Sequence, residues 1–254
     1  PAHQAELAQL DALLLEAVQS LDNDQKLSDS IARANDVLLG MFFELGDPQG
    51  KPDQPLPDYV QRNNLLDVQN PVDSFVQPLA TQNVLPPIPQ LGSRALAIGH
   101  LNSFPDVDGA VRTEPLVVGY YDQYYPSLSL MLAARSLNLE AKDIRVRLGE
   151  GVQLGNQKID TDPDLQMHTY FYKDRDGHPA FPVDSFYDVL SGKIPAEKYR
   201  DKIVLIGASA AGVGTMQVTP IGPGMAPVQI LAHSVSSILR GDYFVSPQWG
   251  GLAE

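Results

Sequence analysis

The chain has 254 residues, which fits one large domain or two small ones, and 43% of them are hydrophobic, enough to form a core. Its 18 basic and 31 acidic residues give a net charge of −13 without a basic cluster, which argues against nucleic-acid binding. The absence of cysteine excludes disulfides, thiolate zinc sites and cysteine nucleophiles. No apolar run reaches the ~18 residues of a membrane span, so we expect any such span to lie outside this chain.

The N-terminal part of the sequence predicts two helices and a strand. Residues 2–21 carry an apolar stripe with alternating spacings of three and four: Leu7, Leu10, Leu14, Ala17 and Leu21. We expect this stripe to pack on the core, and a dimer seam is the alternative. A second helix is expected to begin at Asp22, Asn23 or Asp24, whose side chains can accept backbone N–H bonds, and residues 37–45 are expected to form a strand.

Residues 47–90 form a proline-rich region that contains nine of the 21 prolines. Proline fixes φ and lacks the N–H group that the interior of a sheet requires, so we expect neither a central strand nor a long helix here. A connection of this length is unusual in a compact domain, and we expect a loop that is either functional or mobile.

The rest of the chain alternates between strand and helix patterns. In chain order these patterns predict strands over 93–104 and 110–122, a buried helix over 126–139, a strand-rich stretch over 143–183 with a hairpin turn at Asp176-Gly177, a helix over 184–195, a buried strand over 203–206 and a helix over 226–241. This succession is typical of an α/β domain.

An acidic stretch, Asp106-Val-Asp108-Gly109, has the residue types of a calcium loop. An EF-hand loop that starts at Asp106 would need a ligand at its fifth position and a glutamate at its twelfth. These positions are Ala110 and Val117, so we expect no metal there.

The same stretch fits a tight turn between two strands. Asp108 and Gly109 are the residue types that supply positive φ angles in such turns. We expect Arg112, which begins the next strand, to bond Asp106 or Asp108 and so lock the turn. A ligand-binding role is the alternative, because arginine also recognises carboxylate and phosphate groups well.

The segment Gly207-Ala-Ser-Ala-Ala-Gly212 follows the expected buried strand, where phosphate loops and nucleophile elbows lie in other α/β proteins. It lacks the lysine of a Walker A loop and the paired glycines of a dinucleotide fingerprint, and Ala211 replaces the second glycine of a hydrolase elbow. We therefore expect a structural turn at Gly207. A hydrolase that uses Ser209 with His233 is the alternative, although we expect His233 on the partly exposed face of the last helix.

Five motifs follow one another between residues 98 and 249, within a resemblance that spans about residues 22–249: IGHLNSFPDVDGAVRTEPLV, YYPSLSLMLAARSL, FPVDSFYDVLSGKIP, YRDKIVLIGASAAGVG, and LAHSVSSILRGDYF with SPQW. In this order they resemble the CHASE domain of the second type, a sensory extracellular domain associated with cyclases and histidine kinases. The strongest parts of the resemblance are D-x-D-G-x-x-R, Y-P-S-L, and K-I-V-L-I-G with its small-residue turn.

The resemblance implies a domain on the outer side of a bacterial cytoplasmic membrane, fused through membrane helices to a cytoplasmic cyclase, kinase or diguanylate cyclase. Such domains are taken to sense ligands, and no catalytic residues are attributed to them. The chain departs from the family at Thr215-Met216-Gln217 and at Gln229, where acidic residues are usual. It also lacks the family's N-terminal strand and helix, so we expect a fragment.

We therefore expect a single domain over residues 1–254 of the α/β class, with a mixed, largely buried sheet flanked by helices in a three-layer-like arrangement. It would be a periplasmic sensor of a small-molecule or protein signal, a homodimer in the full receptor, with no nucleic-acid partner. A protein-binding or dimerisation module without a small ligand is the alternative. No catalytic residue, metal or cofactor is expected. Turns at strand ends are where α/β sheets bind ligands, so we expect three residues nearest a pocket: Arg112, Tyr125 and Ser209.

Overall fold

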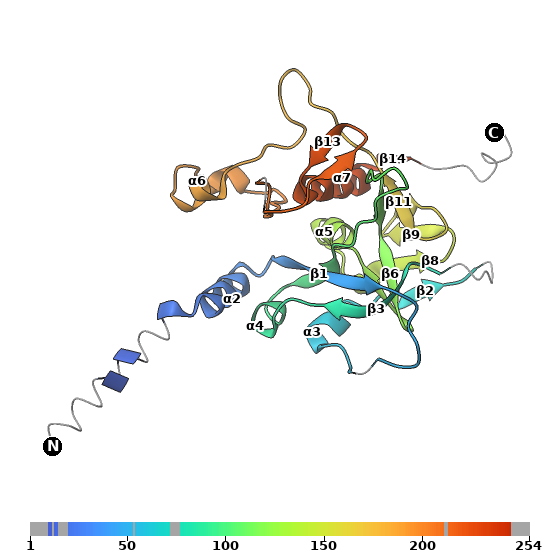
Figure 1. Cartoon of the computed structure of the whole chain (residues 1–254), viewed down its shortest axis with the longest axis horizontal. Helices are drawn as coiled ribbons and strands as arrows, with labels where there is room; N and C mark the ends of the chain where they lie inside the picture. The colour runs from blue at the N-terminus through green and yellow to red at the C-terminus, as the bar shows by residue number, and fades with distance from the viewer. Residues whose placement is uncertain are drawn as a thin grey trace.

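A computed structural model describes residues 10–11, 13–14, 20–52, 54–71, 77–210 and 213–244. Mixed sheets flanked by helices confirm the expected α/β class (Figure 1). The helices are α2 (Asn23–Ala34), α3 (Asp58–Gln61), α4 (Pro89–Gly92), α5 (Leu128–Ser136), α6 (Phe186–Leu190) and α7 (Pro227–Arg240), with short 3-10 turns η1 (Ala141–Asp143) and η2 (Ala196–Tyr199). Among the described helices, none is both long and apolar enough to cross a membrane.

The strands are mostly short. In chain order they are β1 (Leu38–Leu45), β2 (Asp67–Gln69), β3 (Ala80–Leu85), β4 (Ala97–His100), β5 (Thr113–Pro115), β6 (Val117–Tyr120), β7 (Gln123–Pro126), β8 (Ile144–Arg147), β9 (Gly151–Leu154), β10 (Gln157–Asp160), β11 (Gln166–Thr169), β12 (Gln217–Thr219), β13 (Gly222–Met225) and β14 (Tyr243–Phe244).

Five strands form a mixed sheet in the order β4-β1-β3-β6-β7. β1 pairs in parallel with β4 and antiparallel with β3, whereas β3 pairs in parallel with β6 and β6 pairs antiparallel with β7. An isolated parallel bridge links His100, at the end of β4, with Ser127, directly after β7. The two outer strands of the sheet therefore approach each other at one end.

The other strands belong to smaller sheets, in the orders β10-β9-β8-β2, β14-β11-β5 and β12-β13. The sequence predicted one sheet, whereas the described strands are divided among these four. Tight turns explain part of the division, because Gly149 and Gly155 have φ angles of 74° and 57° and reverse the chain between β8, β9 and β10. This local meander forms a small sheet of its own, which β2 joins in parallel with β8.

α5 lies between the five-stranded sheet and α7, and it is buried on nearly all sides as its apolar sequence predicts (Figure 1). Ser127 caps this helix, because its Oγ accepts the Leu130 N–H at 3.1 Å. β4 approaches the first turn so closely that a Cβ atom at Gly99 would lie 2.6 Å from the Leu128 Cα, so only glycine fits there.

α7 ends at Gly241, whose φ of 70° supplies the left-handed C-cap that the sequence predicted. The helix packs against α5 on one side and against β11 on another. Because neighbours cover the helix on both sides, the polar residues His233, Ser234 and Ser237 are buried. The expected exposure of His233 is therefore wrong.

β3 contradicts the prediction for the proline-rich region, because it lies in the middle of the five-stranded sheet between β1 and β6. Pro78 precedes this strand and Pro86 follows it, but residues 79–85 contain no proline. Their backbone N–H groups are therefore available for sheet pairing. The composition of the whole region concealed a short stretch that is competent to form a strand.

α2 begins as predicted, because the Asp22 Oδ1 atom accepts the Gln25 N–H at 2.9 Å. The helix expected over residues 2–21 lies largely outside the described residues, and so do two residues of its apolar stripe. The described residues of that stripe are exposed: Leu10, Leu14 and Leu21. The expectation that the stripe packs on the core is therefore wrong for these three leucines.

The predicted buried strand over residues 203–206 is also wrong. This segment is irregular, and the Ile206 side chain is 78% exposed. One edge of β4 already pairs with β1, and the bridge between His100 and Ser127 occupies its other edge. No further strand can therefore pair with β4. The segment instead passes the first turn of α7, where a Cβ atom at Gly207 would lie 2.7 Å from the Val228 Cβ.

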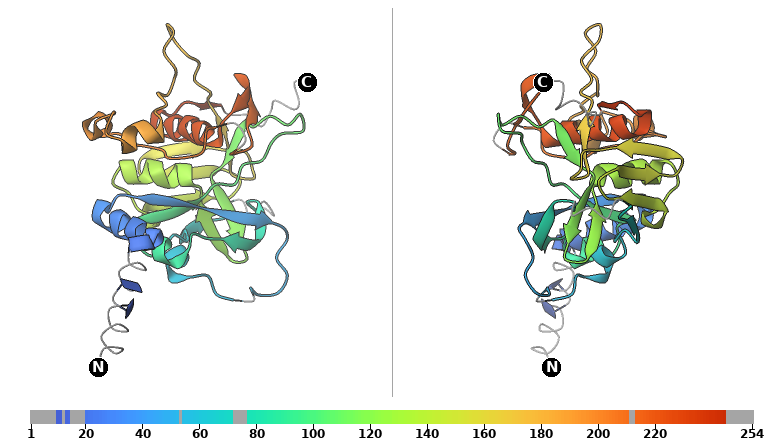
Figure 2. Two further views of the ribbon diagram at one scale, coloured as in Figure 1. Left: turned by 60° about the vertical axis from the view of Figure 1, so that its left-hand side comes forward. Right: turned by 90° about the vertical axis from the view of Figure 1, so that its right-hand side faces the viewer.

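α6 has no buried residue and lies at the edge of the molecule (Figure 2).

Two isoleucines provide a test of this difference. We expect Ile206→Ala to change the free energy of unfolding by less than about 0.5 kcal/mol, because the side chain is already in water. The matched change Ile98→Ala, in buried β4, should lower it by about 2–5 kcal/mol. Urea unfolding of both variants measures the two values. Equal losses of unfolding free energy in the two variants would show that residues 203–206 are buried in the core.

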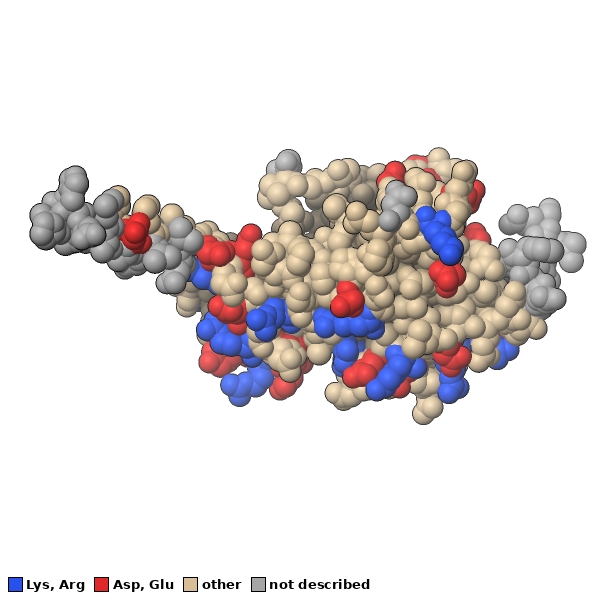
Figure 3. Space-filling model, turned by 90° about the horizontal axis from the view of Figure 1, so that it is seen from below, with Lys and Arg blue, Asp and Glu red and all other residues tan. Residues whose placement is uncertain are grey.

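Figure 3 shows lysine and arginine side chains next to aspartate and glutamate side chains along one half of a face of the molecule, while the rest of that face carries few charges. Ion pairs between neighbouring charges occur in several places, for example Arg145–Asp67 at 2.9 Å and Arg147–Glu150 at 2.7 Å. A mixed surface of this kind lacks the continuous basic stripe by which proteins bind nucleic acid.

Candidate ligand-binding cavity

A cavity of about 1060 Å³ opens between the end of β11, the loop that follows it and the end of α7. Its lining comes from separate parts of the chain: residues 169–175, 178–181 and 220–221, with Arg240, Asp242 and Phe244. Small-molecule sites typically have volumes of ~300–1,000 Å³, so this cavity is large enough for an organic ligand.

The loop after β11 reverses direction at Asp176-Gly177, as the sequence predicted. The two residues have φ angles of 51° and 73°, and an antiparallel bridge joins Arg175 to His178. These angles belong to the turn that favours an Asp-Gly pair. The turn brings residues 178–181 back to form a second side of the cavity.

Aromatic rings form much of the cavity wall. Tyr170 stacks on Phe244, with the ring centres 5.6 Å apart and the planes at 29°. Tyr172 meets the Tyr170 ring at 4.9 Å with its edge, and Phe181 meets Tyr172 in the same manner at 6.0 Å. These rings provide a broad apolar surface whose geometry their mutual contacts fix.

Hydrogen bonds fasten this wall to α7. The Ser237 Oγ atom accepts the Tyr170 N–H at 3.0 Å and lies 3.2 Å from the Tyr170 carbonyl oxygen, to which it donates. The His233 Nδ1 atom accepts the Tyr172 N–H at 3.1 Å, and its ring stacks on that of Tyr172. Burial lowers the pKa of His233 to about 4, so the ring is neutral at pH 7 and Nδ1 is free to accept this bond.

The charged groups of the cavity are three cations and two carboxylates. Arg240 lies over the Tyr172 ring, with its guanidinium carbon 5.1 Å from the ring centre. Within the described residues, neither the Lys173 nor the Arg175 side chain makes a hydrogen bond or ion pair. Each carboxylate accepts one hydrogen bond: Asp242 from the Tyr172 hydroxyl at 3.0 Å, and Asp174 from the Ala180 N–H at 3.1 Å.

A buried carboxyl group lies against α7, close to the cavity wall. Glu114, in β5, accepts the Ser129 hydroxyl of α5 at 2.5 Å and the Ser234 hydroxyl of α7 at 3.2 Å. Burial raises the pKa of Glu114 to about 7, against the lowering effect of these hydrogen bonds. Thr169, which lines the cavity, lies 3.4 Å from the Ser234 Oγ atom. The polar network therefore joins β5, α5, α7 and the cavity wall.

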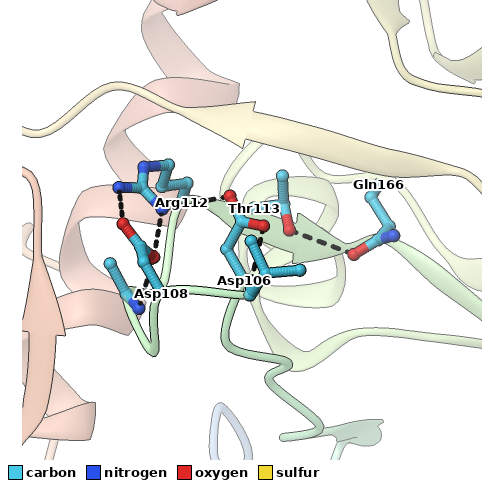
Figure 4. Close-up of polar contacts among 7 residues, drawn as sticks. Asp106, Asp108, Arg112, Thr113 and Gln166 are labelled. Atoms are coloured by element: carbon cyan, nitrogen blue, oxygen red, sulfur yellow. Dashed lines mark hydrogen bonds and ion pairs between the residues drawn. The ribbon is translucent and has the colours of Figure 1, made fainter.

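The acidic turn is locked by Arg112, as the sequence predicted (Figure 4). The guanidinium binds both oxygens of Asp108, at 2.7 and 2.5 Å, and one oxygen of Asp106 at 3.0 Å. This bidentate contact holds the pKa of Asp108 well below its usual range. Gly109 has a φ of 81° and supplies the positive angle of the turn, whereas Asp108 does not. The turn connects two different sheets rather than two paired strands.

The three residues expected nearest a pocket do not come together at the cavity, and none of them contributes to its lining. Arg112 is engaged in the acidic turn. Tyr125 lies in β7 with 0% exposure, packed on Phe43 with the ring centres 5.4 Å apart. Ser209 lies in the exposed irregular segment before α7, and within the described residues no hydrogen bond joins it to His233.

Metal-binding side chains are not gathered in the part of the chain that the structure describes: no three His, Asp or Glu residues lie close enough to hold an ion. The cavity itself offers aromatic rings and cationic side chains, which can together contact an organic molecule.

The cavity could not be predicted from the sequence because its residues come from four separate segments. Each segment alone is unremarkable. One local signal was present, in Thr169-Tyr-Phe-Tyr-Lys-Asp-Arg175, where aromatic residues lead directly into charged ones before an Asp-Gly turn. Such a pattern places rings and charges side by side, but the partner Arg240 lies far along the chain.

Comparison with known proteins identifies the family. The family model of the CHASE2 domain matches residues 2–254. No curated protein and no solved structure matches the chain. The family match spans the α/β sheets, the acidic turn and the cavity described above. The chain belongs to the CHASE2 domain family, whose members are extracellular sensory domains of signalling receptors.

Proposed function

We propose that this chain is the ligand-sensing part of a bacterial membrane receptor, that it lies on the periplasmic side of the membrane, and that it is not itself an enzyme. The observation that carries this proposal is the cavity of about 1060 Å³ beside α7. A concave site lined by aromatic side chains and a few polar groups is the usual form of a small-molecule site.

The position of the cavity offers a route for a signal. Arg240, in the last turn of α7, and Phe244, in β14, both line it. A bound ligand therefore contacts the last described elements of the chain directly. It shifts the receptor between two arrangements, of the domain or of its homodimer, only in so far as it binds one arrangement more tightly than the other.

The test is thermal unfolding of the chain against a library of periplasmic metabolites. A ligand at one hundred times its dissociation constant adds ~2.7 kcal/mol of stability. We expect at least one compound to raise the Tm of the wild-type chain, and Phe244→Ala to reduce this rise because it removes one face of the cavity. Arg112→Ala is the control, and it should retain the rise because the Arg112 side chain is engaged by Asp106 and Asp108 and does not line the cavity.

Two results would contradict the proposal. A rise that is lost in Arg112→Ala and kept in Phe244→Ala would place the ligand at the acidic turn. No rise with any compound would contradict ligand sensing altogether.

A second candidate function, recognition of a protein partner or of a second copy, rests on a different observation. The segment that contains α6 exposes apolar side chains that a lone domain would normally bury: Val183, Phe186, Tyr187, Leu190 and Ile206. Sedimentation of the chain over a range of concentrations distinguishes this function. A dimer that persists without ligand and is lost in Phe186→Ser would favour it.

A further inference from the structure

The side chains that line the cavity indicate the chemical class of its ligand. This inference rests on the proposed ligand-sensing function. We propose that it binds a small organic anion, such as a carboxylate, that also carries a flat apolar ring. The anionic group would be received by Arg240 with Lys173 or Arg175, and the ring would pack on the aromatic wall.

The charge of the lining supports an anion. The cavity lining contains three cationic side chains and two carboxylates. Its net charge is therefore +1, in a chain whose net charge is −13. Each carboxylate already accepts one hydrogen bond, Asp242 from Tyr172 and Asp174 from Ala180. Lys173 and Arg175 are exposed and have no anionic partner within the described residues. These two cationic donors are therefore available to a ligand.

The contacts of Arg240 argue against a cationic ligand. Aromatic cages recognise cations through the open faces of their rings. Here the guanidinium of Arg240 already lies over Tyr172, 5.1 Å from the ring centre. A second cation would meet this fixed positive charge, whereas an anion would find in it a flat, rigid donor that suits a carboxylate.

The aromatic wall indicates the other half of the ligand. Tyr170, Tyr172, Phe181 and Phe244 all line this cavity, and their stacked and edge-on contacts hold the rings in place. Ring surfaces that are already ordered bind a flat apolar group without a large loss of side-chain entropy. An anion without a ring would leave this surface in water.

The experiment compares carboxylates with their neutral amides. The probes are benzoate with benzamide, phenylacetate with phenylacetamide, and indole-3-acetate with indole-3-acetamide, with acetate as the anion that has no ring. Titration calorimetry on the whole chain measures the dissociation constants at one ionic strength. We expect at least one carboxylate to bind about tenfold more tightly than its amide, because a charge-assisted hydrogen bond is roughly twice as strong as a neutral one. The same carboxylate should also bind about tenfold more tightly than acetate, because acetate has no ring to pack on the aromatic wall.

A matched pair of arginine variants locates the binding. Arg240→Gln should abolish the preference for the carboxylate over the amide, whereas Arg200→Gln, at an exposed arginine outside the cavity, should leave it unchanged. Added salt should weaken binding of the carboxylate and have little effect on the amide.

Other outcomes would overturn the inference in distinguishable ways. Amides that bind as tightly as carboxylates, or carboxylates that bind Arg240→Gln unchanged, would refute the anion site but leave a ligand-binding domain. Acetate as tight as phenylacetate would refute the ring. If none of the probes binds, the inference fails, and the metabolite library then decides separately whether the sensing function fails with it.

Discussion

Glu114→Gln is expected to raise the free energy of unfolding by about 2–3 kcal/mol at pH 8 and to leave it nearly unchanged below pH 4.5. In the folded chain, burial raises the pKa of Glu114 to about 7 from its ordinary value of 4.5. The hydrogen-bond partners of this carboxyl group are serine hydroxyls, so no cation compensates its charge. Glutamine keeps the shape of the protonated acid and can still bond both serines.

The sign of the effect follows from proton binding. Between pH 4.5 and about 7 the folded state holds the proton of Glu114 more tightly than the unfolded state, so stability is fully present below pH 4.5 and falls as the pH rises through this window. Burial lowers the pKa of His100 to about 3 and of His233 to about 4, so these residues weaken the fold as the pH falls below about 6.5. Their effect is common to both proteins and cancels in the comparison.

The measurement is urea unfolding of the wild-type chain and the variant at pH 5 and pH 8. The difference between the two proteins should be several times larger at pH 8 than at pH 5. Glu197→Gln, at an exposed glutamate, is the control and should show no such difference. A wild-type stability that changes with pH in the same way as that of Glu114→Gln would show that the buried carboxyl is already ionised or already compensated.

The elements that the sequence predicted well are those whose signals are local. α2 and α7 have their predicted caps at Asp22 and Gly241, because a capping residue acts on the backbone next to it. α5 was recognisable because its sequence is apolar on nearly every side. The Arg112 lock was recognisable because its partners lie only four and six residues away.

The failures concern properties that depend on neighbours far along the chain. An apolar run such as residues 203–206 has the same composition whether or not a sheet edge receives it, and here the edge of β4 is occupied. His233 lies opposite the apolar stripe of α7, but a second layer around Tyr172 buries that face as well. The cavity was invisible for the same reason, since Arg240 and Tyr170 meet only in the folded chain.

Tyr125→Ala is expected to lower the free energy of unfolding by about 3–5 kcal/mol, the usual loss when a large buried aromatic side chain is removed. Tyr125 is completely buried in β7. Its ring packs on Phe43 and Tyr120, at 5.4 and 6.5 Å between ring centres. Its hydroxyl donates to the Gln123 Oε1 atom at 3.0 Å, and burial raises the pKa of this hydroxyl. The side chain therefore joins β7 to β1 within the core.

The conservative variant Tyr125→Phe separates this structural role from the ligand-binding role that the sequence left open. It keeps the ring and removes one hydrogen bond, so we expect a loss of only about 0.5–1.5 kcal/mol. Chemical unfolding measures both variants, and calorimetry with any compound found in the metabolite library measures binding to Tyr125→Phe. Because Tyr125 is outside the cavity lining, the dissociation constant should not change. A large loss of affinity in Tyr125→Phe, with stability nearly intact, would mean that the ligand binds in the core beside β7. The cavity beside α7 would then not be the sensing site.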